Sequence, residues 1–141
     1  MYEQNNGCLC APMRSGLPSF KSARKFSVIG YSISHGTLLL RSGRSDEHDL
    51  RLDVLIKDVR ALEIRSWFEG IEITEVEPSV LDDFPSKPID MLDVGLKVYA
   101  LLGTGWRGFV IGGGLFFHED DAGFMEPSAL LPETSERCDF R

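Results

Sequence analysis

Residues 50–57 read LRLDVLIK and carry the clearest secondary-structure signal of the chain. One side of it carries Leu50, Leu52, Val54 and Ile56, and the other side carries Arg51, Asp53, Leu55 and Lys57. A period of two is typical of a β-strand that buries one face and turns the other to solvent. The stretch therefore predicts a half-buried strand.

A similar alternation begins upstream at Phe26, where Ile29, Tyr31 and Ile33 fall on one side. His35-Gly36 separates this run from the apolar residues 37–40, and glycine permits the positive φ that tight hairpin turns need. The pattern predicts a hairpin. Residues 42–49 contain no apolar side chain, so we expect a solvated loop before the strand at 50–57.

Downstream, Leu62, Ile64 and Phe68 share one side, and Glu69-Gly70 offers a turn into residues 71–74. We therefore expect a second hairpin there. A helix over residues 57–65 is the competing prediction, because so short a window does not exclude helical spacing. Three prolines between residues 78 and 88 then favour a connecting loop with one short helical turn.

The last hairpin is predicted from residues 96–102, a glycine-rich turn at 103–105 and a returning apolar run. That run contains Gly112-Gly113-Gly114, which predicts a strongly bent strand because glycine inside a strand usually marks a bulge or bend. Six or seven short strands indicate a mostly β fold, a small antiparallel barrel or sandwich with at most one or two short helices.

A chain of 141 residues fits one domain. We expect a basic flexible tail over residues 1–25, a β domain over residues 26–126, and a C-terminal tail or extension over residues 127–141. The composition of residues 1–25 is compatible with a native tail, an organelle transit peptide or vector-derived residues.

The net charge of the chain is −7, although its first 25 residues are basic. Much of the excess lies between Glu69 and Asp93, where eight acids face Lys87 alone. A negative field repels nucleic acid and anionic lipid and attracts a basic partner. No apolar run approaches the ~20 residues of a membrane-spanning helix, and an odd number of cysteines favours the cytoplasm. We expect neither nucleic-acid nor membrane binding.

No residue pattern predicts catalysis, and we expect no cofactor. The three histidines do not share a metal-ligand spacing. The weak metal candidates are His118, Glu119, Asp120 and Asp121, for which a solvated turn is the favoured interpretation.

The leading hypothesis is a non-catalytic interaction module, of the inhibitor or immunity type, whose acidic surface binds a basic protein. The expected contact residues are Trp67, Glu72, Glu75, Asp82 and Asp83. One alternative is a small-molecule-binding β-barrel or a small enzyme that uses His118 and nearby carboxylates. Another is a structural homo-oligomer that pairs through its sheet edges or Trp67.

Overall fold

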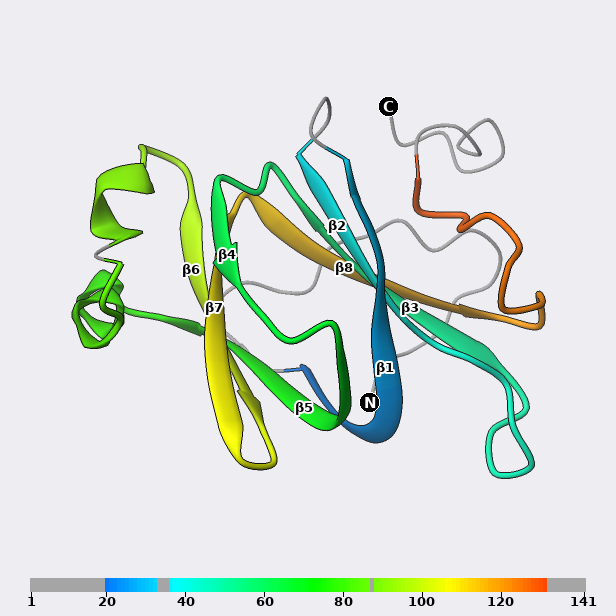
Figure 1. The fold of residues 1–141 in the computed structure, drawn as a ribbon. Helices are drawn as coiled ribbons and strands as arrows, with labels where there is room; N and C mark the ends of the chain where they lie inside the picture. Colours follow the sequence, from blue (N-terminus) through cyan, green and yellow to red (C-terminus); the bar gives the residue numbers. More distant parts are fainter. Residues whose placement is uncertain (1–19, 33–35, 87, 132–141) are drawn as a thin grey trace.

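Eight antiparallel strands form one sheet in the computed structural model, which describes residues 20–32, 36–86 and 88–131 (Figure 1). The predicted mostly β fold is confirmed, and two short 3-10 turns are the only helical elements of the described chain. The sheet order is β4-β7-β6-β5-β1-β2-β3-β8. The elements are β1 (Phe20–Ser32), β2 (Thr37–Ser42), β3 (Arg51–Lys57), β4 (Ala61–Glu63), β5 (Trp67–Val76), η1 (Pro78–Asp83), η2 (Pro88–Met91), β6 (Lys97–Gly103), β7 (Trp106–Gly112) and β8 (Gly114–Asp120).

The strand pairs at the two ends of this order, β4–β7 and β3–β8, are the two halves of one bent two-stranded ribbon. β3 pairs with β8 as far as Lys57 and Gly114, and β4 then pairs with β7 from Ala61 and Ile111 onward. At the corner, the Gly113 amide donates to the Lys57 carbonyl at 2.7 Å. The sheet is open in its pairing order but curls round to give an inner and an outer face, in broad agreement with the predicted barrel or sandwich.

Glycines allow the two strands of the ribbon to approach each other closely at this corner. A Cβ on Gly112 would lie 2.8 Å from the Ile56 side chain and 3.0 Å from the Lys57 carbonyl oxygen. A Cβ on Gly113 would lie 2.9 Å from the side chain of Asp58, which itself has a positive φ of 54°. The predicted bent strand is therefore confirmed: it divides at Gly113 into β7 and β8.

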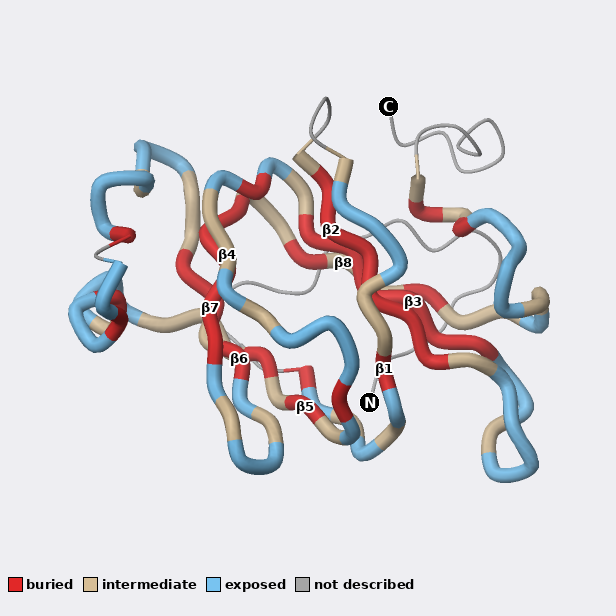
Figure 2. Tube along the Cα trace, in the orientation of Figure 1, coloured by how far each residue is buried: buried red, intermediate tan, exposed pale blue. Residues whose placement is uncertain are grey.

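Apolar side chains cover both faces of the curled sheet. Buried residues accordingly lie along most of its strands (Figure 2). The main core fills the inner face and draws on strands β1, β2, β3, β5, β6, β7 and β8. On the outer face, Leu81 and Phe84 from the η1 region cover β6 and β7, and Leu130 covers β2 and β3. This double coverage explains why every residue of β2 is buried.

The first strand begins earlier than the sequence suggests. Residues 20–25 belong to β1, not to a tail: Phe20 is buried and pairs with Ile73 of β5. The alternation is hard to recognise because the pairing register with β5 shifts between Ser22 and Lys25. A bulge of this kind breaks the period of two.

The second predicted hairpin has its turn in the wrong place. Glu69 and Gly70 lie inside β5, and the chain reverses instead over residues 64–66, between β4 and β5. Gly70 does adopt a positive φ, of 82°, but it does so opposite the register shift in β1. The same glycine property therefore serves a bulge here and not a turn. The competing helix over residues 57–65 does not form.

The other predicted reversals are confirmed. The β1–β2 hairpin includes Gly36 with a φ of 59°, and the β6–β7 hairpin turns through Gly105 with a φ of 80°. His35 lies outside the described residues. The helical turn expected in the proline-rich region is present as η1 and η2.

Candidate functional site

The residues predicted to contact a partner lie in different parts of the fold: three are in β5, and Asp82 and Asp83 are in η1. Trp67, at the start of β5, is 59% exposed, as expected for a side chain that could anchor a partner. Glu72 lies further along the same strand, opposite Leu102 of β6, which is also exposed. Both belong to the outer face.

Glu75 points the other way. It lies opposite Tyr99, whose ring belongs to the inner core, whereas Glu72 lies three residues earlier on the strand. A spacing of three places two strand residues on opposite faces. Burial, and after it the negative charge of Glu75, raises the pKa of Tyr99 to about 12. Glu72 and Glu75 therefore cannot present one common surface.

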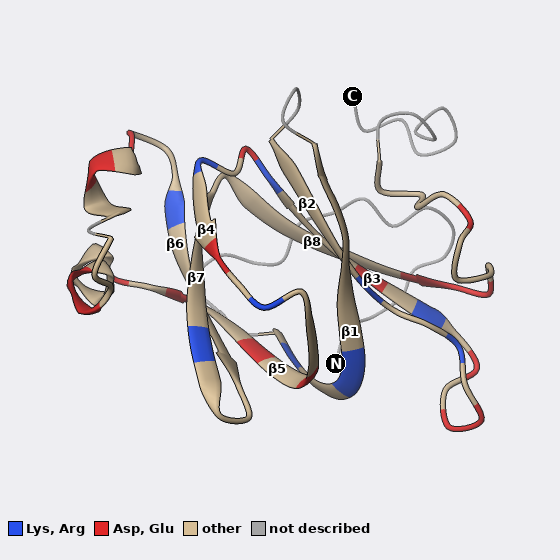
Figure 3. Ribbon diagram, in the orientation of Figure 1, with Lys and Arg blue, Asp and Glu red and all other residues tan. Residues whose placement is uncertain are grey.

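Basic residues lie beside the acidic residues of β5 on the neighbouring strands (Figure 3). Lys21 of β1 lies opposite Glu72, and Lys25 lies opposite Glu69. On the far side of β6, Arg107 lies opposite Leu102. This part of the sheet therefore carries charges of both signs. Opposite charges directly across a strand pair stabilise the sheet modestly.

The connection between β5 and β6 carries a denser group of acids. We call residues 77–95 the acidic segment; its exposed acids are Glu77, Asp82, Asp83, Asp90 and Asp93. Exposed apolar side chains lie among them, namely Ile89, Met91 and Val94. The segment protrudes beside β6 and β7 and is fastened to them by the buried side chains of Leu81 and Phe84 (Figures 1 and 3).

Two of these acids form ion pairs with the sheet. Asp83 lies 3.5 Å from Arg107, and Asp93 lies 2.9 Å from Arg60. All four side chains are about half exposed, so each pair contributes little to stability. Within the described chain, no ion pair is formed by Glu77, Asp82 or Asp90, and their charge faces solvent.

The four weak metal candidates do not form the expected solvated turn. His118, Glu119 and Asp120 are the last three residues of β8, and His118 is buried. Strand alternation sends Glu119 to the face opposite His118 and Asp120. In residues 20–32, 36–86 and 88–131, no three His, Cys, Asp or Glu side chains gather closely enough to hold a metal ion.

His118 and Asp120 instead join a buried group that we call the ionic cluster. It lies on the outer face of β2, β3 and β8, where cross-strand pairing sets Arg41 opposite Asp53, Asp53 opposite His118, and Arg51 opposite Asp120. Arg41 Nε donates to Asp53 Oδ1 at 2.7 Å. Arg51 Nε and Nη2 each donate to Asp120 at 2.9 Å. The cluster is therefore a cross-strand network of bidentate pairs.

A terminal stretch of chain covers this cluster. We call residues 121–131 the strap. Arg51 donates to its carbonyl oxygens at Gly123, Glu126 and Pro127, and Arg41 donates to that at Phe124. Beyond them, Leu130 is buried against Leu39 and Leu55. The start of the predicted C-terminal tail is thus part of the folded structure.

His118 is the unusual member of the cluster. Its Nδ1 atom is buried and has no hydrogen-bond partner in the described structure. Burial lowers the pKa of His118, and Arg51 acts in the same direction, while the carboxylates of Asp120, Asp53 and Glu119 oppose the shift. The imidazole is therefore held neutral within a group of fixed charges.

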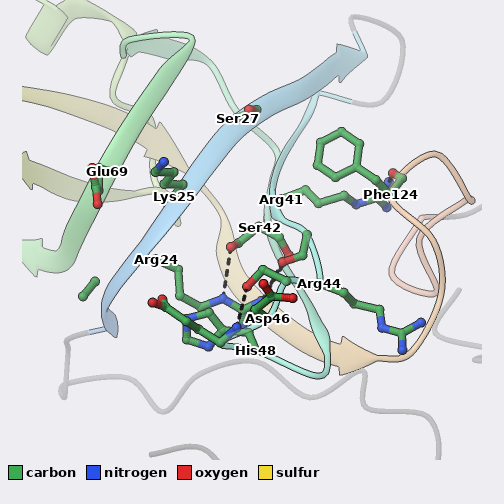
Figure 4. A pocket seen from close by; sticks show the side chains of 14 residues that line it. Arg24, Lys25, Ser27, Arg41, Ser42, Arg44, Asp46, His48, Glu69 and Phe124 are labelled. Atoms are coloured by element: carbon green, nitrogen blue, oxygen red, sulfur yellow. Dashed lines mark hydrogen bonds between the residues drawn. The ribbon is translucent and has the colours of Figure 1, made fainter.

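A shallow pocket of about 540 Å³ lies between the loop over residues 43–50, β1 and the strap (Figure 4). Four basic side chains line it, together with Asp46, Glu47 and Glu69; these bases are Arg24, Lys25, Arg41 and Arg44. The arginines hold protein carbonyls: Arg24 donates to Gly43 and Leu50, and Arg44 donates to Asp49 and Asp121. They therefore act as struts for the loop, and His118 does not line the pocket.

The sequence carries only weak signals for the ionic cluster. Arg41, Arg51 and Asp53 are polar residues of strands, and the alternation of residues 50–57 assigns Arg51 and Asp53 to a solvated face. The strap buries them instead. The one available signal is the short apolar group at residues 129–131, which follows Pro127.

The chain matches no protein-family model, and it resembles no curated protein and no solved structure closely enough to count as a relative. Its class is therefore defined by its own features: a single curled antiparallel sheet with a protruding acidic segment and a buried ionic cluster. Among the described residues, no helix is long and apolar enough to cross a membrane.

Proposed function

We propose that this protein is a non-catalytic interaction module that captures a basic partner protein through its acidic segment, as an inhibitor or immunity-type protein would. The observation that carries the proposal is the exposure of five acids around Ile89, Met91 and Val94. Acidic side chains steer a basic partner toward the surface, and the apolar ones supply contact area once it arrives.

The way the segment is built supports this role. Leu81 is fully buried and Phe84 nearly so, and Phe84 packs edge-on against Phe109 of β7 with ring centroids 4.8 Å apart. A segment fastened in this way presents its acids with less ordering cost than a free loop would. The partner should therefore carry Lys or Arg side chains around an apolar contact.

The contact residues divide accordingly. Asp82 and Asp83 belong to the proposed surface, and Trp67 and Glu72 form a separate candidate contact on the outer face of β5. Glu75 is left out because it faces Tyr99. The proposed setting is the cytoplasm, since the odd number of cysteines does not suggest a disulfide framework.

The experiment starts from a binding partner recovered by affinity capture with the full chain. Association rates are then measured at low and high salt for the wild type and for an Asp82→Asn/Asp90→Asn variant. We expect the variant to associate on the order of 10-fold more slowly at low salt and the difference to shrink at high salt, because exposed charges are screened.

The matched control removes two charges elsewhere. Asp46 and Glu47 are exposed in the loop over residues 43–50, so an Asp46→Asn/Glu47→Gln variant has the same net charge as the test variant. This control should associate nearly as fast as the wild type. Equal rates for all three proteins, or rates independent of salt, would reject the proposal.

The structural homo-oligomer remains the second candidate because Trp67 is 59% exposed. Light scattering at several concentrations tests it directly. A concentration-dependent dimer that Trp67→Ala abolishes would support self-association, and a monomer at every concentration would exclude it. The alternative of a small enzyme has less support, since His118 is buried and does not line the pocket.

A further inference from the structure

The strap is held by two kinds of contact. Its early carbonyl oxygens accept hydrogen bonds from Arg41 and Arg51, and its last residues pack through Leu130 on an apolar patch. Several of its backbone amides donate locally: Ala122 to Asp120 Oδ1 and Leu130 to Ser128 Oγ, each at 3.1 Å, Glu126 to the Gly123 carbonyl at 3.1 Å, and Leu131 to the Ser128 carbonyl at 3.2 Å. Its attachment therefore depends on the charges of the ionic cluster beneath it.

Those charges are balanced only while His118 is neutral. β2 contributes Arg41, β3 contributes Arg51 and Asp53, and β8 contributes Asp120, which gives two positive and two negative groups. Glu119 lies on the opposite side of β8, where it faces Arg24 at 3.9 Å. The strap's own acids, Asp121 and Glu126, are not among the charges that shift the pKa of His118.

A proton on His118 would add a fifth charge to this buried group. Both ring nitrogens of an imidazolium carry hydrogen, so the Nδ1–H of a protonated His118 would be a buried donor without a partner. Burying an unpaired charge or donor is costly, and the cost disappears when water reaches the group. The strap lies over this group through its hydrogen bonds with Arg41 and Arg51 and its buried Leu130, so its release would give water access to the cluster.

We propose that the strap is a pH-responsive latch, closed over the outer face of β2, β3 and β8 while His118 is neutral and opened when His118 takes up a proton. The latch is independent of the partner-binding role of the acidic segment. In the closed state, Leu130 and Leu131 of the strap pack over Leu39, Leu55 and Phe116. Opening exposes these three side chains to water. It also removes Phe124 from the wall of the pocket in Figure 4.

The direction follows from linkage. In the closed state, burial lowers the pKa of His118, whereas in the open state the imidazole meets water and its pKa returns toward about 6.5. The open state therefore binds the proton more strongly. The closed state is fully favoured above about pH 6.5 and loses its advantage as pH falls through the lowered pKa of the closed state.

Hydrogen exchange on the full chain tests the latch. Protection factors of the Glu126, Leu130 and Leu131 amides, corrected for the intrinsic effect of pH, are measured at about pH 7.5 and about pH 5.5. We expect strap protection to fall several-fold at the lower pH, while the amides of β5 and β6 keep theirs. Strap protection that does not change with pH would overturn the proposal.

Two variants separate His118 from the neighbouring carboxylates. His118→Gln keeps a neutral polar side chain, so its strap should remain protected at both pH values. His48→Gln, in the loop over residues 43–50, is the matched control and should respond as the wild type does. A pH response in His118→Gln as large as that of the wild type would assign the effect to Asp53 or Asp120 and overturn the proposal.

A second measurement uses the wild type alone and does not depend on the folding of a variant. Nuclear magnetic resonance follows the His118 imidazole and the strap amides of the wild type through the same titration. The latch requires that both report one midpoint, below that of a solvent-exposed histidine. Strap amides that titrate with a different midpoint, or that do not titrate, would refute the coupling.

Discussion

Arg41 and Asp53 face each other across β2 and β3 as a bidentate pair, with Nε to Oδ1 at 2.7 Å and Nη2 to Oδ2 at 3.1 Å. Both side chains are almost fully buried, at 3% and 2% exposure. A pair of this kind adds little by itself because both ions lose water, yet each partner makes the burial of the other tolerable. The ionic cluster should therefore be sensitive to the loss of one member.

Asp53→Asn is the first prediction. The change leaves Arg41 buried without its counter-ion, and it also removes the charge that lies 3.9 Å from Arg51. We expect the free energy of unfolding to fall by about 3–5 kcal/mol. Urea unfolding measures this loss. Asp46→Asn in the exposed loop should change stability by less than about 0.5 kcal/mol; equal losses in both variants would contradict the role assigned to the pair.

Leu130→Ala tests the apolar end of the strap. Leu130 is 1% exposed and contacts Leu39 and Leu55, so its truncation leaves a cavity. We expect the opening free energy of the strap to fall by about 2–5 kcal/mol, as measured by exchange of its amides. Met125→Ala, in the same strap but 86% exposed, is the matched control and should have little effect.

Gly108→Ala should weaken the pairing of β4 with β7. A Cβ at Gly108 would lie 2.0 Å from the carbonyl oxygen of Glu63, which is backbone and cannot rotate away. We expect a loss of about 1–3 kcal/mol in the free energy of unfolding. Gly30 is the control, because a Cβ there meets nothing within 4 Å. A Gly30→Ala variant that loses as much would show that flexibility, and not the clash, is responsible.

The raised pKa of Tyr99 leads us to expect that the free energy of unfolding falls at alkaline pH. This pKa is raised to about 12 in the folded protein, against about 10 in an unfolded chain. Between these values the unfolded state releases a proton that the folded state keeps, so stability falls as pH rises. At about pH 11 the loss should be about 1 kcal/mol. Urea unfolding of Tyr99→Phe should lack this component, and an unchanged alkaline loss would refute it.

The strands were predictable where apolar and polar residues alternate in the sequence, and this includes β3 although both of its faces are buried. Residues 50–57 and the hairpin around Gly105 follow directly from alternation and turn chemistry. The same rule places Glu72 and Glu75 on opposite faces once both lie in one strand, so their separation could have been predicted. What alternation misses is β1, because the bulge between Ser22 and Lys25 interrupts its period.

The burial of the ionic cluster was not predictable in the same way. The alternation of residues 50–57 assigns Arg51 and Asp53 to the solvent-exposed face of the strand. They are buried because the strap, which is distant in sequence, covers that face. The hydrogen bonds of Arg51 with Asp120 and with the strap join residues 69 or more positions apart. No local pattern reports such a contact. The charge of the acidic segment, by contrast, is visible in composition alone.

The bent ribbon of β3–β4 and β7–β8 also has a consequence for biosynthesis. β3 lies between β2, its immediate predecessor, and β8, the last strand of the described residues. Until β8 emerges, one edge of β3 has no strand to pair with, and Asp53 lacks its cross-strand neighbour His118. Native pairing of this edge must therefore wait until β8 has been synthesised, and a nascent fragment that ends before Gly113 would expose an unpaired edge to chaperones or to aggregation.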